Sequence, residues 1–228
     1  MGHEYIAAHR SYHLLAMQLS QAGFHVLRFD FYGCGDSAGD GERGDVRQWL
    51  SDIEVAIGEL RRRCRFSKVC LGGLRLGASL SMLTACERDD IDGIVLWDPV
   101  ISGDTYIAEL TKLHQDVLQH SYAPPSRRSM AEKPTESLGF PLSGVLLSDL
   151  ANLDLLAIQR KPANKVLIVA TQADTGGTQL KEHLQSTKAH VEYQVLPGPK
   201  LWLEDVNKVL VPNQILQAVV SWISRMYE

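Results

Sequence analysis

Short apolar runs alternate along the chain with longer segments in which apolar residues recur every three or four positions. The runs predict β-strands at residues 24–30, 69–71, 93–97 and 166–170, and at 191–195, where apolar and polar residues alternate as in an edge strand. The periodic segments predict helices at residues 6–22, after Asp45, at 78–86, at 177–187 and from Asn213 onwards. This order predicts an α/β fold with a mostly parallel sheet covered by helices on both faces.

The alternation stops after residue 101 and resumes at residue 161. Helical periodicity covers residues 106–118 and 147–159, on either side of a polar stretch rich in proline. A long segment without a predicted strand, placed directly after a strand, indicates an insertion over the edge of the sheet. We therefore expect a core of residues 1–101 and 161–228 and a mostly helical cap of residues 102–160.

The segment K-V-C-L-G-G-L-R-L-G at residues 68–77 has the most specific pattern in the chain. The spacing of Gly73 and Gly77 is that of the nucleophile elbow G-x-S-x-G, a strand-to-helix turn that exposes a nucleophile. The central residue of this turn is Arg75. A guanidinium stays protonated at neutral pH, so it neither attacks a carbonyl nor accepts a proton.

Together with three further motifs, this elbow resembles the α/β-hydrolase superfamily, in particular the bacterial serine-aminopeptidase-like hydrolases called exosortase A system-associated hydrolases. Those motifs are L-R-F-D-x-x-G-x-G-D-S from residue 27, L-W-D-P-V from residue 96 and A-x-x-x-D from residue 170. The resemblance implies a serine at the elbow, an acid after the seventh strand and a histidine after the eighth. It assigns these places to Arg75, to Asp174 and to residues 197–202, which contain Lys200 but no histidine. The Ser-His-Asp mechanism is therefore not expected.

Two interpretations of Arg75 follow from its place at the head of a helix, where a cation needs an anionic partner. Arg75 could form a buried ion pair with Asp174 or Asp98 that fills the space of the triad. Alternatively, Arg75 and the helix N–H groups could bind the carboxylate or phosphate of a ligand.

The remaining candidates surround this expected site. Asp98, at the end of a strand, is either an alternative acid or the cap of the following turn. Cys34 is the candidate replacement nucleophile and would need a neighbour that lowers its pKa. Contacts with a ligand are expected from Leu76, His3, Lys200 and Trp202.

The resemblance also implies N-terminal strands that this sequence lacks. In that fold the third strand lies between the strands expected at residues 24–30 and 67–72. Without the third strand, backbone groups at the centre of the sheet would stay unpaired, which is costly. We expect a missing upstream segment to complete the sheet; direct pairing of the two strands, or a strand from another chain as in a homo-oligomer, are the alternatives.

Composition restricts the partners. The chain has 228 residues, 45% of them hydrophobic, and a net charge of −4, which gives no sign of a nucleic-acid or membrane partner. Its four cysteines form no C-x-x-C pair, and no metal or cofactor motif is found. The absence of a signal peptide and of a membrane-length apolar segment predicts a cytoplasmic protein.

Three functions fit these observations. The first is a degenerate hydrolase that keeps a pocket for an acyl or carboxylate-bearing ligand. The second is an active hydrolase, thioesterase-like enzyme or lyase that acts on an ester, thioester or amide through rearranged residues such as Cys34, Asp98, Asp174 or His3. The third is a structural or interaction subunit.

Overall fold

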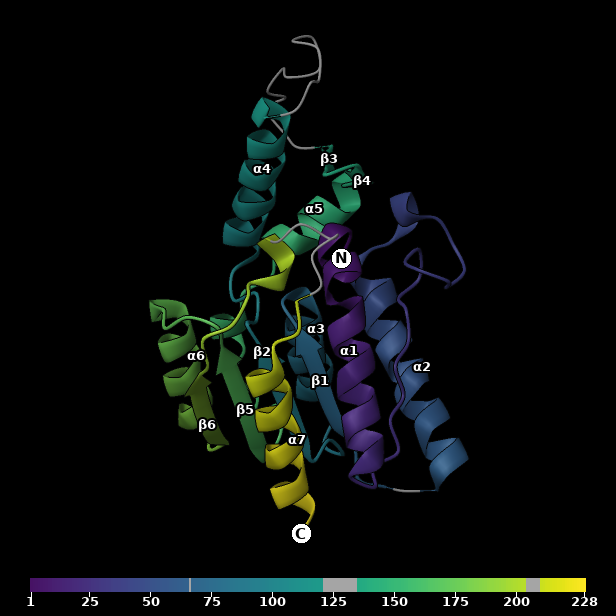
Figure 1. Cartoon of the computed structure of the whole chain (residues 1–228), viewed down its shortest axis with the longest axis vertical. Coiled ribbons are helices and arrows are strands. Elements are labelled where there is room, and N and C mark those ends of the chain that lie inside the picture. The colour runs from purple at the N-terminus through teal and green to yellow at the C-terminus, as the bar shows by residue number, and fades with distance from the viewer. Residues whose placement is uncertain (66, 121–134, 204–209) are drawn as a thin grey trace.

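The computed structural model describes residues 1–65, 67–120, 135–203 and 210–228 (Figure 1). The helices are α1 (His3–Gln21), α2 (Val46–Cys64), α3 (Leu76–Cys86), α4 (Gly103–His120), α5 (Gly144–Ala151), α6 (Thr175–Ser186) and α7 (Asn213–Tyr227). The strands are β1 (Cys70–Leu74), β2 (Gly93–Trp97), β3 (Glu136–Ser137), β4 (Phe140–Pro141), β5 (Lys165–Ala170) and β6 (His190–Val195). Short 3₁₀ helices occur at η1 (Gly41–Arg43), η3 (Leu155–Ala157) and η4 (Leu201–Leu203).

The main sheet has the strand order β1-β2-β5-β6, and its three pairings are all parallel. Leu74 lies beside Trp97, and Trp97 beside Val169, so the strands end at a common edge. Among the described strands β6 pairs only with β5, which makes it an edge strand, as its alternation predicts. The parallel sheet expected from the sequence is confirmed, and its carboxyl edge is where ligand sites of such folds lie.

Two helical layers cover the sheet (Figure 1). α1 and α7 pack on one face around Leu216 and Trp222, and α2, α3 and α6 pack on the other around Ile53 and Leu180. α4, α5 and the β3–β4 hairpin lie beyond the carboxyl ends of the strands. Side-chain caps begin α2, α5 and α6: at α2, for example, the Asp45 carboxylate accepts a hydrogen bond of 2.8 Å from the Gln48 N–H.

Three expectations about the elements are wrong. Residues 24–30 have no regular secondary structure and form no ladder with any described strand, so the strand predicted there is absent from the sheet. The helix expected over residues 147–159 ends at Ala151, and Asp154 caps the separate turn η3. Residues 102–160, which were expected to contain no strand, include the small β3–β4 hairpin. Most of the proline-rich stretch, residues 121–134, lies outside the described residues.

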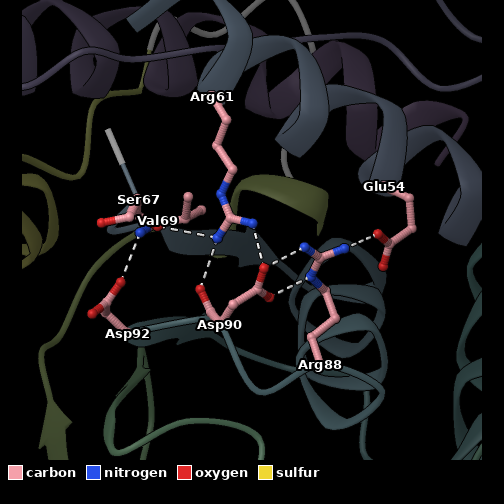
Figure 2. A network of polar contacts seen from close by, with 7 residues as sticks. All are labelled: Glu54, Arg61, Ser67, Val69, Arg88, Asp90 and Asp92. Carbon is pink, nitrogen blue, oxygen red and sulfur yellow. Dashed lines mark hydrogen bonds and ion pairs between the residues drawn. The ribbon is translucent and has the colours of Figure 1, made fainter. Parts of the chain in front are cut away.

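A polar network fixes the start of β1 (Figure 2). Arg61, in the last turn of α2, pairs with the carboxylate of Asp90 and donates to the backbone oxygens of Asp90 at 2.9 Å and Ser67 at 3.1 Å. The Val69 N–H donates to Asp92 at 2.8 Å, and Arg88 extends the network to Glu54. The entry to β1 is thereby tied to α2 and to the loop before β2.

Candidate active site at the strand-to-helix elbow

The elbow between β1 and α3 has the geometry that the glycine spacing predicts. Arg75 has φ 54° and ψ −126°, a conformation that is strained for a residue with a side chain. Its N–H donates to the Trp97 oxygen at 2.9 Å, and its own oxygen accepts from the Ala78 N–H at 3.0 Å. A Cβ on Gly73 would lie 2.2 Å from the carbonyl carbon of Gly77, so only glycine fits there. The turn therefore holds Arg75 in the place of a nucleophile.

Two carboxylates neutralise the Arg75 side chain. Its Nε lies 3.2 Å from Oε1 of Glu4 on α1, and its Nη2 forms an ion pair with Glu109 on α4. The hydroxyl of Tyr106 donates to the second oxygen of Glu4 at 2.6 Å. The Arg75 guanidinium carbon also lies 4.7 Å from the ring centroid of Trp202 and 5.4 Å from that of Tyr106, within the range of cation–π interactions.

Burial and charge act in opposite directions on these groups. Burial by itself would lower the pKa of Arg75, but Glu4 and Glu109 outweigh it and raise the pKa above its ordinary value. Burial, followed by the charge of Glu4, raises the pKa of Tyr106 well above its ordinary value. Arg75 is therefore a permanent cation and Tyr106 a neutral hydrogen-bond donor, and neither can serve as a general base at neutral pH.

The expected ion pair exists, but its predicted partners are wrong. The Asp174 carboxylate caps α6 by accepting from the Gly177 N–H at 2.6 Å. Oδ1 of Asp98 accepts from the N–H and the hydroxyl of Thr171, at 2.9 and 3.2 Å, and so joins the ends of β2 and β5 rather than capping the following turn. Both predicted acids thus accept hydrogen bonds from backbone N–H groups. Arg75 pairs instead with Glu4 on α1 and Glu109 on α4.

One oxygen of Asp98 is left over. Its Oδ2 is buried and has no hydrogen-bond partner among the described residues. Burial raises the pKa of Asp98, and this effect outweighs the opposing hydrogen bonds from Thr171 and the charge of Arg75. The backbone of Asp98 has φ 42°, in the left-handed region that aspartate and asparagine tolerate best.

The other candidates lie around the elbow without forming a triad. Burial raises the pKa of the Cys34 thiol, and this outweighs the opposing charge of the N-terminal ammonium. His3 is half-buried in the first turn of α1, and Leu76 is buried at the start of α3. Lys200 is half-buried, and its backbone oxygen accepts from the Leu203 N–H at 2.8 Å.

Sequence reasoning missed Glu4, Tyr106 and Glu109, which supply the polar contacts of Arg75. Tyr106 and Glu109 are three positions apart on one helix and therefore share a face. This spacing was a usable signal, although nothing in it indicates which residue of the core the face meets. Glu4 carries no such signal, because its burial depends on how α1 lies against the sheet.

No group of histidine, cysteine, aspartate and glutamate side chains that could hold a metal ion occurs among the residues described. In the same part of the chain, no helix is both long enough and apolar enough to cross a membrane.

Comparison with known families decides the membership of this chain. The model of a family described as serine aminopeptidase, S33, matches residues 2–137. The chain belongs to this serine aminopeptidase family. A thermostable monoacylglycerol lipase from Bacillus sp. (strain H-257) is 30% identical over 93 residues, which make up 41% of this chain and 36% of the lipase. The match thus spans about a third of the length of that curated relative.

Solved structures confirm the α/β-hydrolase fold. Est1E from Butyrivibrio proteoclasticus, solved with ferulic acid, matches with a TM-score of 0.68 at 19% identity, over 96% of this chain and 83% of Est1E. An esterase of Pyrococcus furiosus matches with a TM-score of 0.64 at 15% identity, over 96% of this chain and 75% of the esterase. At these identities the likeness shows the fold alone.

Proposed function

We propose that this protein is a member of its hydrolase family that binds an acyl ligand with a carboxylate at the elbow and does not cleave acyl compounds by the Ser-His-Asp mechanism. The observation that carries the proposal is Arg75 itself, which occupies the nucleophile position and is paired with two carboxylates. Acyl transfer needs an attacking atom and a base that takes its proton. A paired guanidinium supplies neither.

The missing base supports the same conclusion. No histidine follows His190 in the sequence, so no imidazole is available after the last strand. Asp174, in the place of the acid, caps α6. Without a nucleophile and a base, an elbow of this kind retains only the weak acceleration that binding and backbone N–H groups provide.

The two partners of Arg75 differ in a way that suits ligand binding. The side chain of Glu4 is 7% exposed and is held by Tyr106, whereas that of Glu109 is 52% exposed. A ligand carboxylate that replaced Glu109 would meet the same guanidinium, which stays in contact with the rings of Trp202 and Tyr106. Glu109 then acts as an internal competitor for the site, and its removal favours the ligand.

Two measurements test this proposal. Wild-type protein and Arg75→Ser should both fail to hydrolyse 4-nitrophenyl butyrate above the uncatalysed rate, because a serine alone lacks a base. Decanoate should bind with an affinity that rises several-fold in Glu109→Gln and falls at least tenfold in Arg75→Met. Decanol, which has the same chain but no charge, should bind weakly to all three, and Glu182→Gln, an exposed position on α6, is the matched control.

Either of two results would overturn the proposal. Equal binding of decanol and decanoate would mean that Arg75 holds no carboxylate. Ester turnover by the wild type that is abolished by Cys34→Ala or Asp98→Asn would instead establish a hydrolase with rearranged residues. The buried free oxygen of Asp98 is the feature that favours this second candidate.

A further inference from the structure

Glu4 is held beside the Arg75 guanidinium by contacts to both of its carboxylate oxygens. Oε1 lies 3.2 Å from Nε of Arg75. Oε2 accepts from the Tyr106 hydroxyl at 2.6 Å and lies 3.4 Å from the nitrogen of Met1. The side chain of Glu4 is 7% exposed, and Tyr106 is 1% exposed. A carboxylate with both oxygens engaged and little access to water keeps its place, so its charge stays next to Arg75.

Glu109 is a different kind of partner for the same guanidinium. It pairs with Nη2 of Arg75 from α4, through a side chain that is 52% exposed. Ion pairs of this exposure contribute little to stability, because water competes for both charges. The carboxylate that an incoming anion displaces is therefore that of Glu109, whereas Glu4 remains in place.

The net charge around Arg75 limits which anion can make this exchange. Glu109 carries one negative charge, so a head group with one negative charge replaces it without changing the net charge of the cluster. A head group with two negative charges adds one more, next to the carboxylate of Glu4. Repulsion between like charges is strong where water is largely excluded, and a doubly charged group also loses more hydration energy on burial. The site therefore favours a monoanion over a dianion.

The ammonium of Met1 does not alter this comparison. It lies beside Glu4 rather than in the position of Glu109, and it is present whichever head group binds. The difference between the two head groups is one negative charge in either case.

A second carboxyl at the same edge of the sheet acts in the same direction. Leu74 of β1 pairs with Trp97 of β2, so the next residues, Arg75 and Asp98, lie side by side where the two strands end. Oδ2 of Asp98 is buried and has no hydrogen-bond partner among the residues described. Negative charge on Asp98 therefore adds to that of Glu4 and further disfavours a doubly charged head group.

We propose that Glu4 makes the elbow selective for amphiphiles with a singly charged head group, such as a carboxylate, a sulfate or a phosphodiester, against doubly charged phosphate monoesters. The inference rests on the proposed carboxylate site and names the class of ligand that this site takes. Glu4 is its specificity-determining residue, and it acts through the charge that it keeps beside Arg75. The sequence leaves both a carboxylate and a phosphate open as ligands of Arg75, and this charge excludes the phosphate in its doubly charged form.

The test uses the full chain and four amphiphiles with chains of equal length, titrated below their micelle concentrations in a calorimeter. Decanoate, decyl sulfate and decyl methyl phosphate carry one negative charge at pH 7.5, whereas decyl phosphate carries nearly two. Each of the first three should bind the wild type at least about tenfold more tightly than decyl phosphate does. Decyl methyl phosphate is the matched ligand, because it differs from decyl phosphate by one methyl group and one charge.

Three variants assign the selectivity to a residue. Glu4→Gln removes the charge and should reduce the difference between the two phosphates to less than about threefold. Glu109→Gln should tighten the binding of all four amphiphiles and leave that difference unchanged, because each of them displaces Glu109. Glu182→Gln, an exposed position on α6, is the control for loss of a distant carboxylate. If Glu4→Gln does not fold, the wild-type comparison of the two phosphates still decides the class of ligand.

The outcomes separate this inference from the proposed function. Equal binding of decanol and decanoate would overturn both, because Arg75 would then hold no anion. If decanol binds weakly but decyl phosphate binds as tightly as decyl methyl phosphate, the inference fails and the carboxylate site stands. Loss of that tight binding in Lys200→Met would then identify the half-buried Lys200 as the cation that accepts the second charge. Selectivity that persists in Glu4→Gln would show that Glu4 does not set it.

Discussion

Replacing Glu4 with glutamine tests whether the elbow is held by its buried carboxylate. Glu4→Gln keeps the size of the side chain but removes a charge that lies 3.2 Å from Arg75 Nε, 2.6 Å from the Tyr106 hydroxyl and 3.4 Å from the N-terminal nitrogen. The side chains of Glu4 and Arg75 are only 7% and 12% exposed, so solvent screens their interaction weakly. Loss of one partner from a buried ion pair costs about 3–5 kcal/mol. Because Glu109 remains, we expect the lower end, about 3 kcal/mol.

Two further variants make this magnitude interpretable. Glu109→Gln removes a partner that is 52% exposed and should cost at most about 1 kcal/mol, as for a surface pair. Arg75→Met leaves Glu4 without its main cation and should cost about as much as Glu4→Gln. In the double variant both charges are gone, and the coupling between the two changes should be at least about 2 kcal/mol.

Urea unfolding followed by tryptophan fluorescence measures these differences, provided that the denaturant slope stays the same across the series. The reasoning fails if Glu4→Gln costs no more than Glu109→Gln. Additive costs in the double variant would also refute it, because they would mean that Glu4 and Arg75 stabilise the fold independently.

Three further predictions concern the turn, the free acid and the thiol. Gly73→Ala should lower the free energy of unfolding by several kcal/mol or prevent folding. Gly77→Ala, whose Cβ would come no closer than 4.0 Å to Tyr12, should leave the stability unchanged or raise it by about 1 kcal/mol, because alanine favours the helix. Equal shifts of Tm in the two variants would contradict this. Because the pKa of Asp98 is raised by burial, its contribution to stability is present at low pH and is lost as the pH rises through the folded pKa; Asp98→Asn should therefore raise Tm at pH 7 but not near pH 3. The raised pKa of Cys34 predicts alkylation by iodoacetamide at pH 7.5 that is much slower than for the urea-unfolded chain, and equal rates by mass spectrometry would count against it.

The strands that the sequence predicts well are those whose neighbours lie within the chain. β2 and β5 are continuous apolar runs because helices cover both of their faces. Residues 24–30 have a similar composition, but a strand also needs a neighbouring strand, and this segment forms no ladder with any described strand. Composition reports which side chains tolerate burial, whereas pairing depends on which segments meet.

The location of the candidate site could also be predicted from the sequence, although the residues that contact Arg75 could not. Parallel strands end at a common edge, so Arg75 and Asp98 had to lie near each other. Glu4 and Glu109 reach Arg75 from α1 and α4, which are about one hundred residues apart in the sequence. Their positions depend on helix packing, and no local pattern encodes that packing.

The elbow shows how a turn of this kind forms independently of its central side chain. Its strained φ is fixed by backbone bonds to Trp97 and Ala78 and by the contact between Gly73 and Gly77, none of which involves the central side chain. Any residue at position 75 is therefore presented at the same point. A nucleophile presented there can attack, whereas a guanidinium presented there can only attract an anion. The backbone of this turn is consequently evidence for the fold, and the carboxylates around Arg75 are evidence for its chemistry.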